Sequence, residues 1–198
     1  MITDNFSKYI KNLFDIQDRE ITFCESFIKL KTIPKGRVLV RSGEINKELY
    51  FVEQGLLRQF FVDKNGKEHI LYFAPENWLL GDRNSSYFNL PTEFTIEAIE
   101  DTIVVILDPE FFINLSKEYQ NAIAKSEFLL HRHIRQLQTR VSQLLGATAE
   151  ERYLDFITTY PNLMMRVPQW MIASYLGITP ESLSRVRREL AKKNFLPG

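Results

Sequence analysis

Residues 168–190 read PQWMIASYLGITPESLSRVRREL, and this stretch decides how the chain is organised. Its pattern predicts two short helices joined by a tight turn at Gly177-Ile178-Thr179. Gly177 is suited to the left-handed backbone of such a turn. Thr179 can cap the second helix, and Pro180 is acceptable at its first position.

The apolar residues of this stretch predict close packing of the two helices. On the first helix, Ile172 and Leu176 would face a core, and the small side chain of Ala173 would let the second helix cross closely. On the second helix, Leu183 and Val186 share one face with Leu190. A two-helix packing unit with a solvated charged face is the alternative interpretation.

The opposite face of the second helix has the chemistry of a major-groove reader. Arginine can bond guanine O6 and N7, glutamate can accept from cytosine N4, and serine can contact a base edge or a phosphate. Arg187, Lys192 and Lys193 would meet the phosphate backbone. The predicted DNA-contacting residues are Thr179, Glu181, Ser182, Ser184, Arg185, Arg187, Arg188 and Lys192.

The composition is that of an ordinary globular protein. The chain has 198 residues, 44% of them hydrophobic, with 25 basic and 25 acidic side chains. No apolar run approaches about 18 residues, so we expect no transmembrane helix and no membrane partner. The first residues, MITDNFSKYIKNLF, lack the apolar segment of a secretory signal, so we expect a cytoplasmic protein.

The zero net charge conceals a basic cluster near the end of the chain. Residues 146–198 carry seven basic and five acidic groups, and residues 185–193 alone hold five basic groups and one acid. A local basic cluster on a neutral protein predicts a small anionic contact patch.

From about Leu30 to Leu107 the chain is dense in β-branched and aromatic residues with turn signals at short spacing. Asp63-Lys64-Asn65-Gly66 predicts a hairpin, because Asn-Gly tolerates positive φ values. Seven or eight short strands with regular turns predict a sandwich or jelly roll.

A helical texture follows the strands. Asp108-Pro109-Glu110 predicts a helix start with proline in the first turn, and a long helix is expected after Tyr119. Its apolar residues follow a three/four spacing, which predicts a dimer of two parallel helices. Packing on the chain's own β domain is the alternative. The predicted dimer-interface residues are Ile123, Leu130, Ile134, Leu137, Val141 and Leu144.

The long helix is expected to end at a hinge, Gly146-Ala147. Thr148 and Glu151 have the spacing of a capping box, which predicts a new helix. We therefore expect three parts: a β-roll domain with an N-terminal helix over 1–108, a helical connector and dimerisation helix over 109–145, and a helix-turn-helix domain over 146–198.

Over about residues 20–195 the chain resembles the Crp/Fnr family of bacterial transcription regulators, most specifically in 168–190. The resemblance implies an α+β fold. An N-terminal antiparallel, jelly-roll-like β-roll of the cyclic-nucleotide-binding type with flanking helices would precede a long dimerisation helix and a C-terminal helix-turn-helix domain. Family members usually continue into a two-stranded wing; the sequence ends at residues 195–198, FLPG, so we expect little or no wing.

The second helix of 168–190 resembles the Fnr branch, in which a Glu-x-x-Ser-Arg pattern reads the operator. Here the pattern is Glu181, Ser184 and Arg185. The resemblance implies a homodimer on double-stranded DNA, a palindromic operator with TGA-like half-sites, and RNA polymerase as a further partner.

The resemblance also locates a nucleotide site, and the sequence departs from it. The family cassette has Gly-Glu near its start and Arg-Ser or Arg-Thr about ten residues later. Here the pairs are Gly81-Asp82 and Thr92-Glu93, so the arginine that neutralises the cyclic phosphate is missing. Arg83 could replace this arginine if it approached the phosphate from a different direction. On the long helix, Leu137 and Gln138 would be the positions that contact the base of a bound nucleotide. We expect that cyclic AMP is not the effector and that any small-molecule effector is a different one.

Cofactor chemistry has little support. Some sensors of the family use iron–sulfur clusters or haem, but Cys24 is the only cysteine, which excludes a cysteine-ligated cluster. His69 is a lone histidine in a strand, and His131 and His133 fall on different helix faces. We expect no metal, no cofactor and no enzyme activity. The remaining alternative is a sensor module that acts through protein partners rather than DNA.

Overall fold

The computed structural model describes residues 3–17, 22–119 and 121–195. The chain divides into two compact units. The first unit contains Met1–Lys67 and Leu71–His131, and the second contains Glu68–Ile70 and Arg132–Gly198. The division into three parts at residues 108 and 145 stays a prediction.

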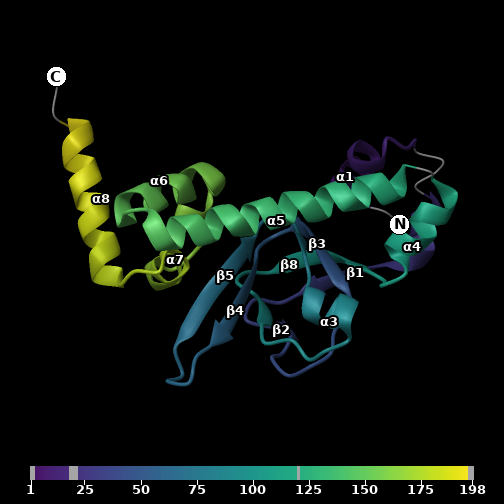
Figure 1. The fold of residues 1–198 in the computed structure, drawn as a ribbon, viewed down its shortest axis with the longest axis horizontal. Helices are drawn as coiled ribbons and strands as arrows, with labels where there is room; N and C mark the ends of the chain where they lie inside the picture. The colour runs from purple at the N-terminus through teal and green to yellow at the C-terminus, as the bar shows by residue number, and fades with distance from the viewer. Residues whose placement is uncertain (1–2, 18–21, 120, 196–198) are drawn as a thin grey trace. The chain divides into compact units, whose positions relative to one another are not determined.

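The strands form two four-stranded sheets (Figure 1). One sheet has the order β1-β8-β3-β6 and the other β2-β7-β4-β5. The registered pairs β1–β8, β3–β8, β3–β6, β2–β7 and β4–β7 are antiparallel, as the β-roll interpretation predicts. The strands are β1 (Ile28–Ile33), β2 (Val38–Val40), β3 (Leu49–Gln54), β4 (Leu57–Val62), β5 (Glu68–Ala74), β6 (Leu79–Leu80), β7 (Thr95–Ala98) and β8 (Thr102–Leu107).

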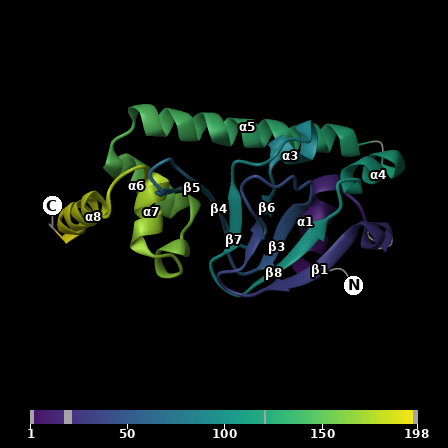
Figure 2. The same ribbon diagram turned by 90° about the horizontal axis from the view of Figure 1, so that it is seen from below.

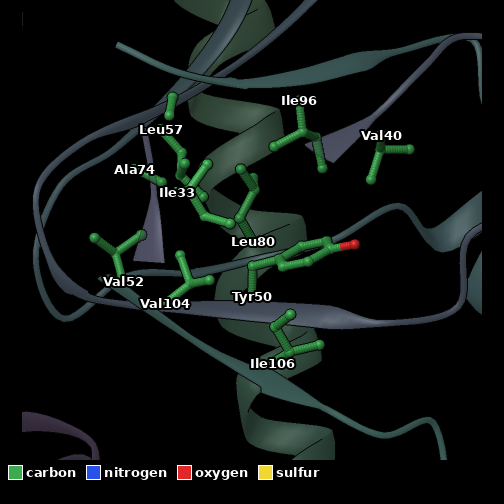
Figure 3. Close-up of a cluster of buried hydrophobic side chains, with 11 residues drawn as sticks. Ile33, Val40, Tyr50, Val52, Leu57, Ala74, Leu80, Ile96, Val104 and Ile106 are labelled. Carbon is green, nitrogen blue, oxygen red and sulfur yellow. The ribbon is translucent and has the colours of Figure 1, made fainter. Parts of the chain in front are cut away.

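Alternation along the strands sends aliphatic side chains into the space between the sheets. Figure 3 shows this cluster. Its members come from all eight strands: Ile33, Val40, Tyr50, Val52, Leu57, Ala74, Leu80, Ile96, Ala98, Val104 and Ile106. These buried side chains form an apolar core between the two sheets.

The N-terminal helix α1 (Asp4–Phe14) covers the outer face of the β1-β8-β3-β6 sheet (Figure 2). Phe6 and Ile10 are buried in a cluster with Phe51 of β3. The start of α1 is held by Glu53 of β3, whose carboxylate accepts the backbone N–H of Asn5 at 2.9 Å and of Phe6 at 3.0 Å.

The hairpin at residues 63–66 is confirmed between β4 and β5. Asp63 accepts the backbone N–H of Asn65 at 2.8 Å, and Asp63 donates its own backbone N–H to Lys67 O at 2.9 Å. Within residues 63–66 only Gly66 has a positive φ, +79°. The expectation that Asn65 would also adopt a positive φ was therefore wrong. The longer turn needs one left-handed residue instead of two.

The remaining helices follow the predicted order with one correction. Helix α4 begins at Phe111, so Pro109 lies before the helix rather than in its first turn, and Asp108 accepts the N–H of Glu110 at 2.9 Å. The helices are α3 (Arg83–Phe88), α4 (Phe111–Glu118), α5 (Ala122–Gly146), α6 (Ala149–Thr159), α7 (Gln169–Leu176) and α8 (Pro180–Phe195), with 3₁₀ turns η1 (Thr22–Phe27) and η2 (Leu163–Met165).

The long helix was correctly placed: α5 has 25 residues and ends at Gly146, and Figure 1 shows it as one continuous helix. Helix α8 extends to Phe195, and the expectation about a wing falls on residues 196–198, which lie outside the described residues. Within the described ranges, no helix is both long and apolar enough to cross a bilayer.

Candidate nucleic-acid interface

Helices α7 and α8 are joined by the tight turn that the sequence predicts. Gly177 is left-handed, with φ +66°. Its N–H donates to Ser174 O at 3.1 Å, and the N–H of Ile178 donates to Ala173 O at 3.0 Å. These bonds use two of the carbonyl groups that a helix leaves without partners at its end. The turn therefore ends α7 sharply and starts α8 three residues later.

The predicted packing of the two helices is confirmed. Ile172, Ala173 and Leu176 have no exposed surface. Leu183 and Val186 of α8 are also buried. Figure 2 shows α6, α7 and α8 gathered in one group, and Tyr175 of α7 contacts the rings of Phe156 and Tyr160 at centroid distances of 5.4 Å and 5.8 Å.

Thr179 caps α8 as expected. Its hydroxyl accepts the N–H of Ser182 at 3.2 Å. The Glu181 carboxyl is fully exposed, and its pKa is lowered by its own backbone N–H and by the Thr179 hydroxyl. The positive end of the helix also favours a carboxylate there. Glu181 is thus an ionised acceptor at the exposed start of α8.

The exposed face of α8 carries most of the predicted DNA-contacting residues. Glu181, Ser184 and Arg185 are exposed opposite the buried Leu183 and Val186. Thr179, Arg187, Arg188 and Lys192 are also exposed, whereas Ser182 is half-buried and accepts a hydrogen bond from the Thr179 hydroxyl at 3.2 Å. The arrangement offers one acceptor, one hydroxyl and several guanidinium donors to a ligand on one side of the helix.

Two contacts on the flanks of α8 were missed by the sequence reasoning. Arg187 donates to the Gln169 side-chain oxygen at 2.7 Å, and Lys193 forms an ion pair with Glu150 at 2.6 Å. These partners lie 18 and 43 residues away. No local pattern could have identified them, because each pair forms only when separate helices come together.

The junction between α5 and α6 has the predicted capping box. The Thr148 hydroxyl accepts the N–H of Glu151 at 3.2 Å, and the Glu151 carboxylate accepts the N–H of Thr148 at 2.7 Å. The hydrogen bond from the backbone N–H of Thr148 is the main reason that the pKa of the Glu151 carboxyl is lowered.

The predicted dimer seam is an exposed apolar stripe. Five of its six members are exposed although they are large and apolar: Ile123, Leu130, Ile134, Val141 and Leu144. Leu137 is half-buried. Within the described chain this stripe is far more open than the cores of either unit, so it is available to a partner.

The predicted nucleotide cassette lies around α3. Asp82 is 6% exposed and is the N-cap of α3, where it accepts the N–H of Asn84 at 3.3 Å and of Ser85 at 3.2 Å. Gly81 lies so close to Leu49 that a Cβ would come within 2.2 Å of its side chain. The first-turn amides of α3 are therefore already occupied by a carboxylate of the chain.

The second cassette pair has no arginine to offer an anion. Thr92 is buried and its hydroxyl accepts the N–H of Phe94 at 3.0 Å, while Glu93 is exposed. Arg83 is exposed at the start of α3. The structure places these residues with Gly81 and Asp82 in the first unit, whereas Leu137 and Gln138 lie on the part of α5 that belongs to the second unit.

A shallow hollow of about 530 Å³ lies beside the end of α5. Gln138 lines it, but Leu137 does not. The other lining residues are Arg135, Thr139, Ser142, Gln143, Gly146, Ala147 and Glu151. Elsewhere, the described residues contain no group of three or more His, Cys, Asp or Glu side chains placed to hold a metal ion.

Comparison with known proteins agrees with this architecture. A family model of the cyclic nucleotide-binding domain matches residues 30–119. The Fumarate and nitrate reduction regulatory protein of Yersinia pestis is 25% identical over 195 residues, covering 92% of this chain and 77% of that protein.

Solved structures share the fold. FixK2 from Bradyrhizobium japonicum superposes with a TM-score of 0.73 at 20% identity, covering 86% of this chain and 88% of FixK2. The Catabolite Activator Protein of Thermus thermophilus gives a TM-score of 0.57 at 21% identity, covering 94% and 89% of the two chains. The order of a β-roll, a long helix and a helix-turn-helix is common to the predicted fold and the observed one.

Proposed function

We propose that this chain, which is similar to Crp/Fnr-type transcription regulators, acts as a homodimeric, sequence-specific DNA-binding regulator that does not depend on cyclic AMP. The observation that carries the proposal is the face of α8. Glu181, Ser184 and Arg185 are exposed together, opposite the residues that anchor the helix. A helix that enters the major groove needs this division.

Each exposed side chain has a matching group on DNA. Arg185 donates two hydrogen bonds to guanine O6 and N7, and the ionised Glu181 accepts from cytosine N4. Ser184 contacts a base edge or a phosphate. Arg187, Arg188 and Lys192 bind phosphates and fix the register of the helix on the duplex. Thr179 and Ser182 hold the start of α8 through the cap.

The stripe on α5 supports a dimer. Paired parallel helices would bury Ile134, Leu137 and Val141, whose spacing matches a coiled-coil seam. A dimer also explains the expected palindromic operator with TGA-like half-sites, because two recognition helices then read two half-sites about 34 Å apart. One short helix alone gives too few base contacts for a specific site.

Three features support independence from cyclic AMP. The arginine of the family cassette is absent, Asp82 binds two first-turn amides of α3, and buried apolar side chains lie in the described space between the sheets. A cyclic phosphate at this site would lie near the buried Asp82 carboxylate, and Arg83 is the only cation among the predicted site residues. A different effector would act by binding one of two dimer arrangements better than the other. RNA polymerase is the partner through which a bound regulator would change transcription.

Titration of DNA against salt tests the proposal. The purified chain is mixed with a palindromic duplex that carries two TGA-like half-sites, or with a scrambled duplex of the same composition. We expect preferential binding to the palindrome, and a plot of log K against log salt with a slope of roughly −4 to −6, as six phosphate contacts per dimer would give. Equal, weak binding to both duplexes would contradict the proposal and favour a module that acts through protein partners.

A further inference from the structure

We propose that Arg140 and Arg152 are positioning residues that brace the junction at Gly146 and thereby set the orientation of α8 relative to the dimerisation helix α5. The inference rests on the proposed DNA-binding function. All the contacts that carry it lie within the second unit.

Arg140 connects α5 to the end of α7. Its guanidinium carbon lies 3.7 Å from the centroid of the Tyr175 ring, and its Nη2 donates a hydrogen bond to the Tyr175 backbone carbonyl. The preceding carbonyls, of Ala173 and Ser174, accept from the turn. Arg140 thus binds a further carbonyl of the last turn of α7, where the helix dipole favours a cation.

Arg152 ties the two sides of the junction from α6. Its Nη1 donates to Ala147 O at 2.8 Å and to Gln143 O at 3.3 Å. The carbonyl of Gln143 belongs to the last turn of α5, so an arginine of α6 caps the helix that precedes it. Arg140 therefore holds the end of α7 against α5, and Arg152 holds α6 against the end of α5.

Gly146, the last residue of α5, has open space beside its Cα. A Cβ at this position would meet no atom within 4 Å. By contrast, a Cβ at Gly177 would lie 3.1 Å from the Leu144 side chain, one helical turn after Arg140. Helix α5 therefore contacts the α7–α8 segment at two successive turns, through Arg140 and Leu144. The arginine contacts determine the orientation of the helices on either side of Gly146.

The bracing has a consequence for reading DNA. In a dimer the two α8 helices must enter grooves about one turn apart, so a small rotation at the junction displaces both recognition faces. A braced junction fixes the half-site spacing that the dimer accepts. A loosened junction lowers the affinity for that spacing and tolerates others better.

The role of Arg140 is tested by measuring how strongly the protein discriminates between duplexes with different half-site spacings. Affinities are determined for a palindromic duplex and for two duplexes with one base pair inserted or removed between the half-sites. We expect Arg140→Ala to lower affinity for the preferred duplex about tenfold and to change the others less, so that the discrimination ratio falls. Arg132→Ala removes the same charge from an exposed position on α5 and should keep the wild-type ratio. Tyr175→Phe retains the ring face and the carbonyl, and should keep it too.

An unchanged ratio in Arg140→Ala overturns the inference, whether or not overall affinity falls, because a merely structural defect weakens binding to all three duplexes alike. Hydrogen exchange of the full chain without DNA separates this failure from failure of the proposed function. We expect faster exchange at residues 146–148 and 177–179 in Arg140→Ala than in wild type. Equal exchange rates in the two proteins would also overturn it.

Discussion

Helices α3 and α8 begin in similar ways, but their first turns face different surroundings. At α3 the capping carboxylate of Asp82 is buried and accepts two amides of its own helix. At α8 the Thr179 hydroxyl takes over the capping, and the Glu181 carboxylate remains exposed with a lowered pKa. In both helices an oxygen atom accepts hydrogen bonds from first-turn N–H groups. At α3 this uses a buried carboxylate, whereas at α8 the Glu181 carboxylate remains exposed to a ligand.

The two regions differ in the groups that they expose to a ligand. The region around α3 has a buried carboxylate at the helix start, and the predicted cassette pair there has no arginine. The α7–α8 region has the predicted packing and exposes Glu181, Ser184 and Arg185. Substitutions on the exposed face of α8 and in the α5 stripe test DNA binding and dimerisation. A substitution in the Gly177 turn and addition of the nucleotide test the packing of α8 and the region around α3.

Leu137→Glu should have the largest effect. A carboxylate in the centre of the paired helices would be buried without a partner in both copies, which costs about 3–5 kcal/mol when no cation compensates it. We expect a monomer by light scattering after size exclusion, and loss of operator binding. Leu145→Glu is the matched control, because Leu145 is 83% exposed and lies outside the seam. A Leu137→Glu dimer of unchanged mass would contradict the assignment of the seam.

Arg185→Ala should weaken operator binding by about tenfold to one hundredfold, since one bidentate arginine–guanine pair contributes about 1–3 kcal/mol of discrimination. The dimer and the folded state should be unaffected, because Arg185 is exposed. Titrations with operator and scrambled duplexes give the preference directly. Full operator affinity in this variant would mean that α8 does not read DNA with this residue.

Gly177→Ala should destabilise the second unit by about 1–2 kcal/mol, because a left-handed residue with a Cβ is strained and this Cβ would also press on Leu144. Trp170 lies in this unit, so denaturation followed by fluorescence in a Trp78→Phe background reports on it. Gly66→Ala has a similar φ but open space around it, and its effect on its own unit gives the backbone cost alone. Equal costs would show that the Leu144 contact is unimportant.

Cyclic AMP should have the smallest effect, namely none. We expect no heat of binding by calorimetry and an operator affinity that is the same with and without a saturating concentration of the nucleotide. An Arg83→Ala variant is the companion measurement, because Arg83 is the only cation among the residues of the predicted nucleotide site. Tight binding that this substitution removes would refute the account of α3.

The sequence was most informative where short-range physics determines the structure. The turn at Gly177, the cap at Thr179 and the capping box at Thr148 each depend on residues within a few positions, and all three are confirmed. The closely spaced strands were likewise recognisable from their β-branched residues. Helix α3 was not predicted, although Asp82 before Asn84 and Ser85 is an N-cap signal.

Contacts between distant segments could not be predicted. The Arg140–Tyr175 contact joins residues 35 positions apart, and Glu53 holds a helix start 47 positions before it. Such pairs are fixed by the packing of whole elements, which no local pattern encodes. The exposed face of α8 was predictable because it follows from helix periodicity, whereas the brace that orients it was not.

Selection from a pool of random duplexes tests the central claim most directly. We expect the wild-type chain to enrich two-fold symmetric sequences with TGA-like half-sites whose centres lie about one helical turn apart, and Arg185→Ala to lose the enrichment. Recovery of unrelated sequences with no symmetric element, or the same enrichment by both proteins, would contradict it.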